Sequence, residues 1–110
     1  MTFRQSCIYG TRQFGIEDQG WVAWFAIAAV LGKQITIYGD GKQIRDVLHV
    51  KDLARAYEAA FENRAKACGQ AFNIGGGTGN TLSLLELISQ LQSELRLNIP
   101  LNWSDTRPGD

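Results

Sequence analysis

The amino-acid sequence predicts a small α/β fold. Short stretches rich in β-branched and aromatic residues alternate with longer stretches whose apolar residues recur at helical spacing. Turns that contain glycine separate the two kinds of stretch, and such alternation is typical of α/β proteins. The 110 residues suffice for one small domain with a modest core. We therefore expect a single domain over residues 1–110.

The first half of the chain predicts a strand, a helix and a second strand. Residues 2–9 form the first predicted strand. Asp18 is suited to cap a helix that runs to about Leu31, with Gly32 as its stop. Because this helix is apolar on every side, we expect it to be buried on most sides. Residues 34–38 form the second predicted strand.

A glycine-rich turn, Gly39-Asp40-Gly41, leads into the second half of the chain. A short strand is predicted over residues 47–50, and Asp52 is expected to cap the helix at 53–63. Leu53, Ala56, Tyr57, Ala60 and Phe61 share one face of that helix.

The C-terminal third predicts one more strand and one more helix. Residues 64–70 are a connection that leads to the strand 71–74. The segment 83–86 fits a capping box for a helix to about Arg96, and the tail from Asn98 reads as a strand and then a loop. The buried stripe of this last helix is predicted to consist of Leu84, Leu87, Ile88, Leu91 and Leu95.

Composition excludes several classes of protein. Eleven basic residues balance eleven acidic ones, so the chain carries no charge excess that would favour nucleic acid or an anionic membrane. Cys7 and Cys68 have no paired spacing, and with one histidine we expect no zinc site. Reduced thiols and the lack of a signal-peptide pattern predict a cytoplasmic protein. The longest apolar run, 21–31, is too short to span a bilayer.

Two arginines are candidates for anion binding. Arg45 follows the glycine turn and lies between Asp40 and Asp46, so it either forms a local ion pair or grips a pyrophosphate. Arg107 precedes Pro108, which restricts its backbone to extended forms, but alone it also fits a solvated tail. Tyr38 ends a strand beside the turn, where its ring is able to stack on a base.

Other motifs carry weaker signals. The run 75–80 is rich in glycine, but it lacks the ending of a P-loop and the spacing of a dinucleotide fingerprint. His49 is expected to be a half-buried structural residue, because it has no nucleophile partner in a motif. From the residues alone, we expect the chain to bind an anionic small molecule and little more.

Five blocks in order resemble the nucleotide-sugar epimerases and dehydratases of the extended short-chain dehydrogenase group. They are Phe3 to Gly10, Lys33 to Asp46, Asp52 with its helix, Phe72-Asn73-Ile74-Gly75 and Arg107-Pro108-Gly109-Asp110. The match covers nearly the whole chain. It implies the small mixed α/β substrate-binding part of an NAD-dependent epimerase, with one orphaned strand of the Rossmann sheet.

The resemblance also implies roles for individual residues. Arg45 and Arg107 would hold the substrate diphosphate, and Thr36, Ile37 and Tyr38 would flank the base. Gln19 and Trp21 would lie near the phosphates at a helix N-terminus. Gln5, Ser6 and Cys7 would line the junction between nicotinamide and sugar. Cys7 stands where many relatives have asparagine, and Thr11 where they have proline.

The resemblance is strongest to members that epimerise a CDP-sugar at C2 through a 2-keto intermediate, with NAD as cofactor. The family's glycine-rich NAD site and its helical Tyr-x-x-x-Lys pair do not occur in this sequence. We therefore expect a fragment without the N-terminal dinucleotide-binding portion, inactive by itself and forming a homo-oligomer. A 4-epimerase or 4,6-dehydratase fragment and a stand-alone, non-catalytic binding module remain the alternatives.

Overall fold

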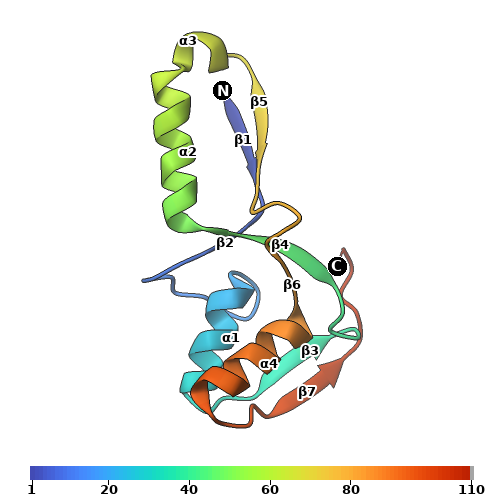
Figure 1. Ribbon diagram of the computed structural model, residues 1–110. Helices are drawn as coiled ribbons and strands as arrows, with labels where there is room; N and C mark the ends of the chain where they lie inside the picture. Colours follow the sequence, from blue (N-terminus) through green and yellow to red (C-terminus); the bar gives the residue numbers. More distant parts are fainter. Residues whose placement is uncertain (110) are drawn as a thin grey trace. The chain divides into compact units, whose positions relative to one another are not determined.

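Strands and helices alternate along the chain in the computed structural model, which describes residues 1–109 (Figure 1). Every strand pairing for which a register is defined is parallel. The chain divides into two compact units, residues 1–13 with 45–81 and residues 14–44 with 82–110. The predicted α/β class is confirmed. Whether the two units behave as one domain stays a prediction.

The first unit is built on two pairs of parallel strands. β1 (Thr2–Gln5) pairs with β5 (Ala71–Ile74), and β2 (Cys7–Tyr9) pairs with β4 (Ile44–His49). The prediction of one continuous strand over residues 2–9 is wrong, because the chain changes partner at Ser6. The backbone N–H of Ser6 still donates to Ile74, and the next residue already faces Val47. β1 is therefore not an isolated strand: it is paired along one edge.

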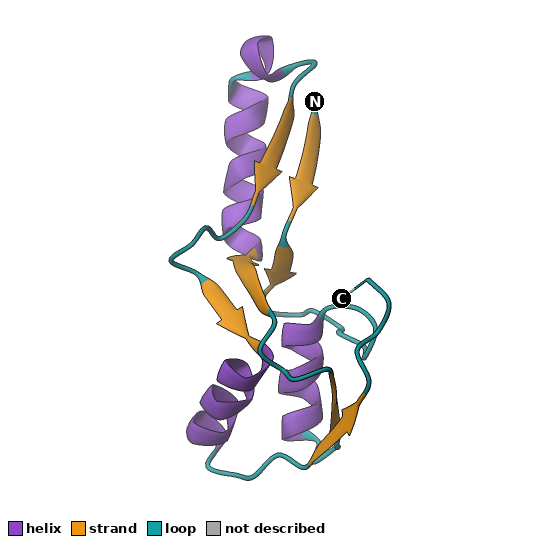
Figure 2. Cartoon of the chain, turned by 90° about the vertical axis from the view of Figure 1, so that its right-hand side faces the viewer, coloured by secondary structure: helices purple, strands orange, loops and turns teal. Residues whose placement is uncertain are grey.

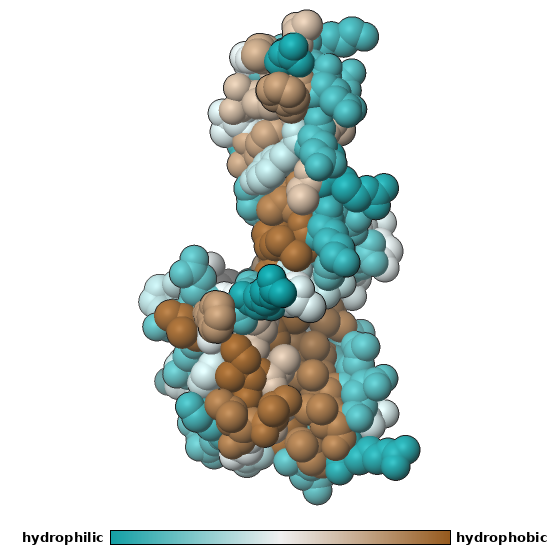
Figure 3. Space-filling model, turned by 90° about the vertical axis from the view of Figure 1, so that its left-hand side faces the viewer, coloured by the Kyte–Doolittle hydropathy of each residue, from teal (hydrophilic) through white to brown (hydrophobic). Residues whose placement is uncertain are grey.

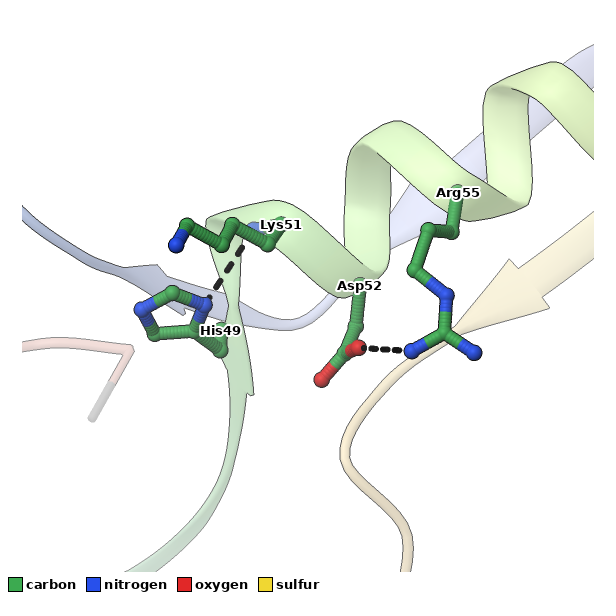
Figure 4. Close-up of polar contacts among 4 residues, drawn as sticks. All are labelled: His49, Lys51, Asp52 and Arg55. Atoms are coloured by element: carbon green, nitrogen blue, oxygen red, sulfur yellow. Dashed lines mark hydrogen bonds and ion pairs between the residues drawn. The ribbon is translucent and has the colours of Figure 1, made fainter.

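α2 (Val50–Glu62) covers one face of the β1–β5 pair (Figures 1 and 2). The predicted cap at Asp52 is wrong: His49 is the N-cap, and its Nδ1 accepts from the Lys51 backbone N–H at 3.3 Å. Asp52 lies in the first turn and pairs with Arg55 at 3.1 Å (Figure 4). A histidine cap satisfies an N–H of the first turn as Asp would, which gives His49 the expected structural role.

Two small differences complete the first unit. The connection after α2 contains a short helix, α3 (Arg64–Ala67), where a plain connection was predicted. β4 begins at Ile44, three residues before the predicted strand, and so includes Arg45. The glycine segment 75–80 is a loop, as predicted, and it approaches β4 closely. A Cβ at Gly76 would collide with the Val47 carbonyl, so this approach requires glycine.

The second unit contains the main hydrophobic core of the chain. α1 (Trp21–Val30) and α4 (Leu84–Leu95) pack beside the parallel pair β3 (Ile35–Tyr38) and β7 (Leu101–Ser104). The core consists of Phe25, Ala28, Ala29, Ile35, Ile37, Leu87, Ile88 and Ile99. The predicted burial of α1 on most sides is confirmed, because only Val30 of its residues is exposed. β6 (Thr81–Ser83) leads the chain into α4.

Local chemistry explains how these helices begin and end. The Ser83–Glu86 capping box is present, with the hydroxyl accepting from the Glu86 N–H and the carboxylate accepting from the Ser83 N–H. α1 ends at Val30, and Gly32, the predicted stop, has a positive φ that allows Lys33 to donate back to Ala28. The predicted stripe of α4 is buried only in part, because Leu95 at its last residue is exposed. No helix among residues 1–109 has the length and apolar character needed to cross a bilayer.

Candidate functional site

The N-terminus of α1 differs from the prediction in a way that bears on ligand binding. Asp18 does not cap the helix: Gly20 is the N-cap, with φ 75°, and no side chain bonds to the N-terminal turn. Helix N-terminal N–H groups without a side-chain acceptor favour anions. The Asp18 carboxylate accepts instead from Arg107 Nη1 at 3.1 Å.

Arg107 and Tyr38 form the centre of the site in the second unit. The guanidinium carbon of Arg107 lies 4.2 Å from the centroid of the Tyr38 ring. The Tyr38 hydroxyl donates to Glu17 Oε1 at 3.0 Å. Two carboxylates on the loop before α1 therefore hold an arginine and a tyrosine that come from the end of the chain and from β3.

The environment of Tyr38 changes its acidity. The hydrogen bond to Glu17 is the main cause that raises the pKa of Tyr38 above its ordinary value of 10.0, with further contributions from burial and from the charges of Glu17 and Asp18. The Arg107 charge acts in the opposite direction. Tyr38 therefore stays a neutral hydroxyl at physiological pH, with a ring face already used to hold a planar cation.

A surface depression of about 570 Å³ opens beside this pair. The end of β3, the glycine turn and the segment after β7 form it, with the lining residues Tyr38, Gly39, Asp40, Gln43, Ser104, Asp105 and Thr106. Gly39 and Gly41 both have positive φ, as the tight turn predicted. Gln43 Nε2 donates to the Tyr38 carbonyl at 3.0 Å and so ties the turn to the strand end. The depression is rich in hydrogen-bond acceptors.

Other predicted residues of the second unit have different positions. Ile37 is fully buried in the core, and its side chain does not line the depression. Thr36 is half-buried on the same strand. Gln19 lies on the loop before α1, where its backbone exchanges two hydrogen bonds with Ile16. Trp21 begins α1, and its Nε1 is buried without a protein hydrogen-bond partner among the described atoms.

The first unit contains a second depression, of about 480 Å³. Its lining includes Gln5 and Ser6, two of the three residues expected near the nicotinamide, together with Arg4, Asp46, Asn73, Ile74, Gly75 and Gly77. The Ser6 hydroxyl is buried and has no protein partner among the described atoms, so it is available to a polar ligand group. Cys7 is half-buried on β2 with a free thiol.

Arg45 lies on β4 in the first unit and is half-buried, whereas Arg107 belongs to the second unit. That these two arginines bind one diphosphate together stays a prediction. No feature of the sequence predicted Glu17 and Asp18 as partners of Tyr38 and Arg107. Asp18 and Arg107 are 89 positions apart, and Asp18 fits a helix cap equally well.

Known proteins resemble this chain over most of its length. A family model described as the NAD dependent epimerase/dehydratase family matches residues 1–75. A CDP-paratose 2-epimerase of Salmonella typhi is 46% identical over 97% of this chain, and a UDP-glucose 4-epimerase of Bacillus subtilis is 34% identical over 71%. The chain spans only 35% and 24% of these two relatives.

Solved structures agree with the sequence comparison. A UDP-glucuronic acid 4-epimerase from Bacillus cereus, in complex with UDP-glucuronic acid and NAD, superimposes with a TM-score of 0.84 at 30% identity. The match covers 98% of this chain and 33% of that protein. Sequence, parallel-strand architecture and structural similarity agree. The chain belongs to the NAD-dependent epimerase/dehydratase family.

Proposed function

We propose that this chain is the substrate-binding part of a CDP-sugar 2-epimerase that works through a 2-keto intermediate. The identity to the Salmonella CDP-paratose 2-epimerase, 46% over nearly the whole chain, supports this substrate class. The observation that carries the proposal is the stacked Arg107–Tyr38 pair beside an acceptor-rich depression. Such a pair supplies a fixed cation for a diphosphate and a rigid edge for a base.

The diphosphate would be held by Arg107 and Arg45 and by the N-terminal turn of α1 near Gln19 and Trp21. The Arg107 guanidinium is held in place beside the depression, because it stacks on the Tyr38 ring and donates one N–H group to Asp18. The guanidinium has five donors, so a phosphate is able to bind while the Asp18 contact persists. The uncapped N–H groups of α1 add donors of the kind that anions prefer.

The acceptors of the depression favour cytosine over uracil. Cytosine presents an amino group at the position where uracil presents a carbonyl, and a carboxylate accepts from the amine but repels the carbonyl. Asp40 and Asp105 line the depression with Ser104 and Thr106. Replacing Asp105 with Asn supplies both a donor and an acceptor, so it should reduce the preference for CDP over UDP.

The cofactor is NAD, which supplies the hydride acceptor and donor of the reaction when bound. Gln5, Ser6 and Cys7 would meet its nicotinamide end, and the orphaned Ser6 hydroxyl fits a polar group there. The sequence contains neither the glycine-rich fingerprint nor the helical Tyr-x-x-x-Lys pair. We therefore propose that the 110-residue chain alone binds the nucleotide sugar without turnover and acts in the cytoplasm as a homo-oligomer.

Titration calorimetry of CDP, UDP and dTDP into the 110-residue chain tests the proposal. We expect CDP to bind most tightly, Arg107→Ala to weaken its binding by roughly tenfold, and Arg107→Lys to recover only part, because lysine cannot form the bidentate contact. A matched control, Arg64→Ala, removes an exposed arginine of the first unit and should have no effect. Preference for UDP or dTDP would favour the 4-epimerase or 4,6-dehydratase alternative. No binding to the folded chain would contradict the proposal.

A further inference from the structure

The turn before α1 presents two consecutive acidic side chains, on a unit whose surface is in part strongly hydrophobic (Figure 3). Ile16 and Gln19 exchange two backbone hydrogen bonds, at 2.9 and 3.0 Å, and so close the turn. Glu17 and Asp18 are its two central residues. A Cβ on Gly15 would lie 2.5 Å from a backbone nitrogen of α1, so this close approach requires glycine. The turn is therefore packed directly against the start of the helix.

The two carboxylates belong to a closed cycle of contacts. The Tyr38 hydroxyl donates to Glu17 at 3.0 Å, and the centroid of its ring lies 4.2 Å from the guanidinium carbon of Arg107. Arg107 donates to Asp18 at 3.1 Å, and the peptide bond links Asp18 back to Glu17. All four residues belong to the second unit. Because each contact restrains the geometry of the others, we expect the loss of one carboxylate to loosen the arginine on the tyrosine ring.

The cycle carries more negative than positive charge. Glu17 and Asp18 contribute two carboxylates, and Arg107 contributes one guanidinium. Asp40 and Asp105 line the depression beside the cycle and add to the negative charge. A phosphate group that approaches Arg107 is therefore attracted by the guanidinium and repelled by the carboxylates. A ligand that also places a base in the depression gains contacts that offset this repulsion, whereas a free phosphate gains none.

We propose that Glu17 and Asp18 are positioning residues that make the site prefer a nucleoside diphosphate to free pyrophosphate. The inference rests on the proposed function. Glu17 acts through Tyr38 and Asp18 acts through Arg107, and together they fix the plane of the guanidinium at the edge of the depression. A nucleotide whose base lies in the depression meets this fixed plane with its diphosphate. Free pyrophosphate has no base to align it and meets the same excess of negative charge.

Titration calorimetry of CDP and of inorganic pyrophosphate into the 110-residue chain, at low salt, tests this preference. We expect Asp18→Ala to lower the ratio of the two association constants, CDP over pyrophosphate, by roughly threefold, the scale on which exposed ion pairs act. Glu17→Ala should lower the ratio too, and Glu17→Gln should recover most of it, because the amide oxygen still accepts from Tyr38. Glu94→Ala removes an exposed acid on α4 and is the matched control. If Asp18 merely repelled phosphates, Asp18→Ala would bind both ligands more tightly at an unchanged ratio, which would overturn the proposal.

The arginine itself provides a second test. Because Asp18 acts through Arg107, adding Asp18→Ala to Arg107→Ala should leave the ratio where Arg107→Ala alone puts it. In NMR spectra the Tyr38 ring current shifts the side-chain proton signals of Arg107, and Asp18→Ala should move these signals toward their free values, whereas Glu94→Ala should not. Nucleotide binding with an unchanged ratio and unmoved Arg107 signals overturns this inference alone. A folded chain that binds neither ligand contradicts the proposed function and, with it, the preference.

Discussion

The two units of this chain differ in how they bury apolar side chains. In the second unit, two helices and a strand pair enclose a core of eight buried residues. In the first unit only Leu48 and Ala67 are buried, and α2 has no buried residue at all. Parallel strands usually have both faces covered, and in the first unit α2 covers one face of the β1–β5 pair. The comparison indicates that the second unit has a buried apolar core of its own, whereas most apolar side chains of the first unit are only half-buried or exposed.

The largest expected effect is on the core of the second unit. Ile37→Ala removes a fully buried side chain and should lower the free energy of unfolding by about 2–4 kcal/mol. Leu53→Ala, on the half-buried face of α2, should cost less than about 1.5 kcal/mol. Urea unfolding followed by tryptophan fluorescence measures the effect of Ile37→Ala, since all three tryptophans lie in the second unit. Circular dichroism follows the unfolding of both variants. If the two substitutions lowered the free energy of unfolding equally, the distinction between the units would be lost.

A second test compares two glycines with positive φ in the second unit. A Cβ at Gly41 would lie 2.9 Å from Leu85, whereas one at Gly32 would meet nothing. Gly32→Ala should cost about 1 kcal/mol from backbone strain, and Gly41→Ala about 2–3 kcal/mol because overpacking adds to it. Thermal unfolding of the two variants measures the difference. Similar values would mean that α4 shifts to make room for the methyl group.

The helix caps provide a comparison between the units. Ser83→Ala removes the hydroxyl that accepts from Glu86 N–H and should cost about 1 kcal/mol. His49→Ala removes a single cap contact, whereas the α4 cap belongs to a reciprocal capping box, so the histidine substitution should cost less. Amide hydrogen exchange in the first turns of α4 and α2 reports each loss locally. A greater loss at α2 would show that the histidine contributes more than its cap contact.

The smallest effect concerns pH. The backbone N–H and then the hydroxyl of Ser83 lower the pKa of Glu86 below its ordinary value of 4.5. A carboxylate whose pKa is depressed by folding stabilises the folded chain above its unfolded pKa, and this contribution is lost as the pH falls through the folded value. Glu86→Gln should therefore flatten the pH dependence of unfolding below about pH 4.5. Glu94→Gln, near the other end of α4, is the control.

The sequence alone determined the features that depend on neighbouring residues. The α/β class, the glycine turn at 39–41, the Gly32 stop and the Ser83–Glu86 capping box follow from local backbone chemistry. The sequence also indicated the family, because the family's motifs keep their order along the chain.

Only the tertiary structure decided which of two locally equivalent partners a side chain takes. Asp18 had the chemistry of a helix cap, but folding places it within 3.1 Å of Arg107. Residues 2–9 had the composition of one strand, but β5 and β4 pair with separate parts of it. The apolar residues predicted to share one face of α2 also differ in burial, because Leu53, Ala56 and Ala60 are half-buried whereas Tyr57 and Phe61 are exposed. In each case the residues that compete for a contact are far apart in the sequence. Which contact is more stable therefore depends on the folded arrangement of the chain.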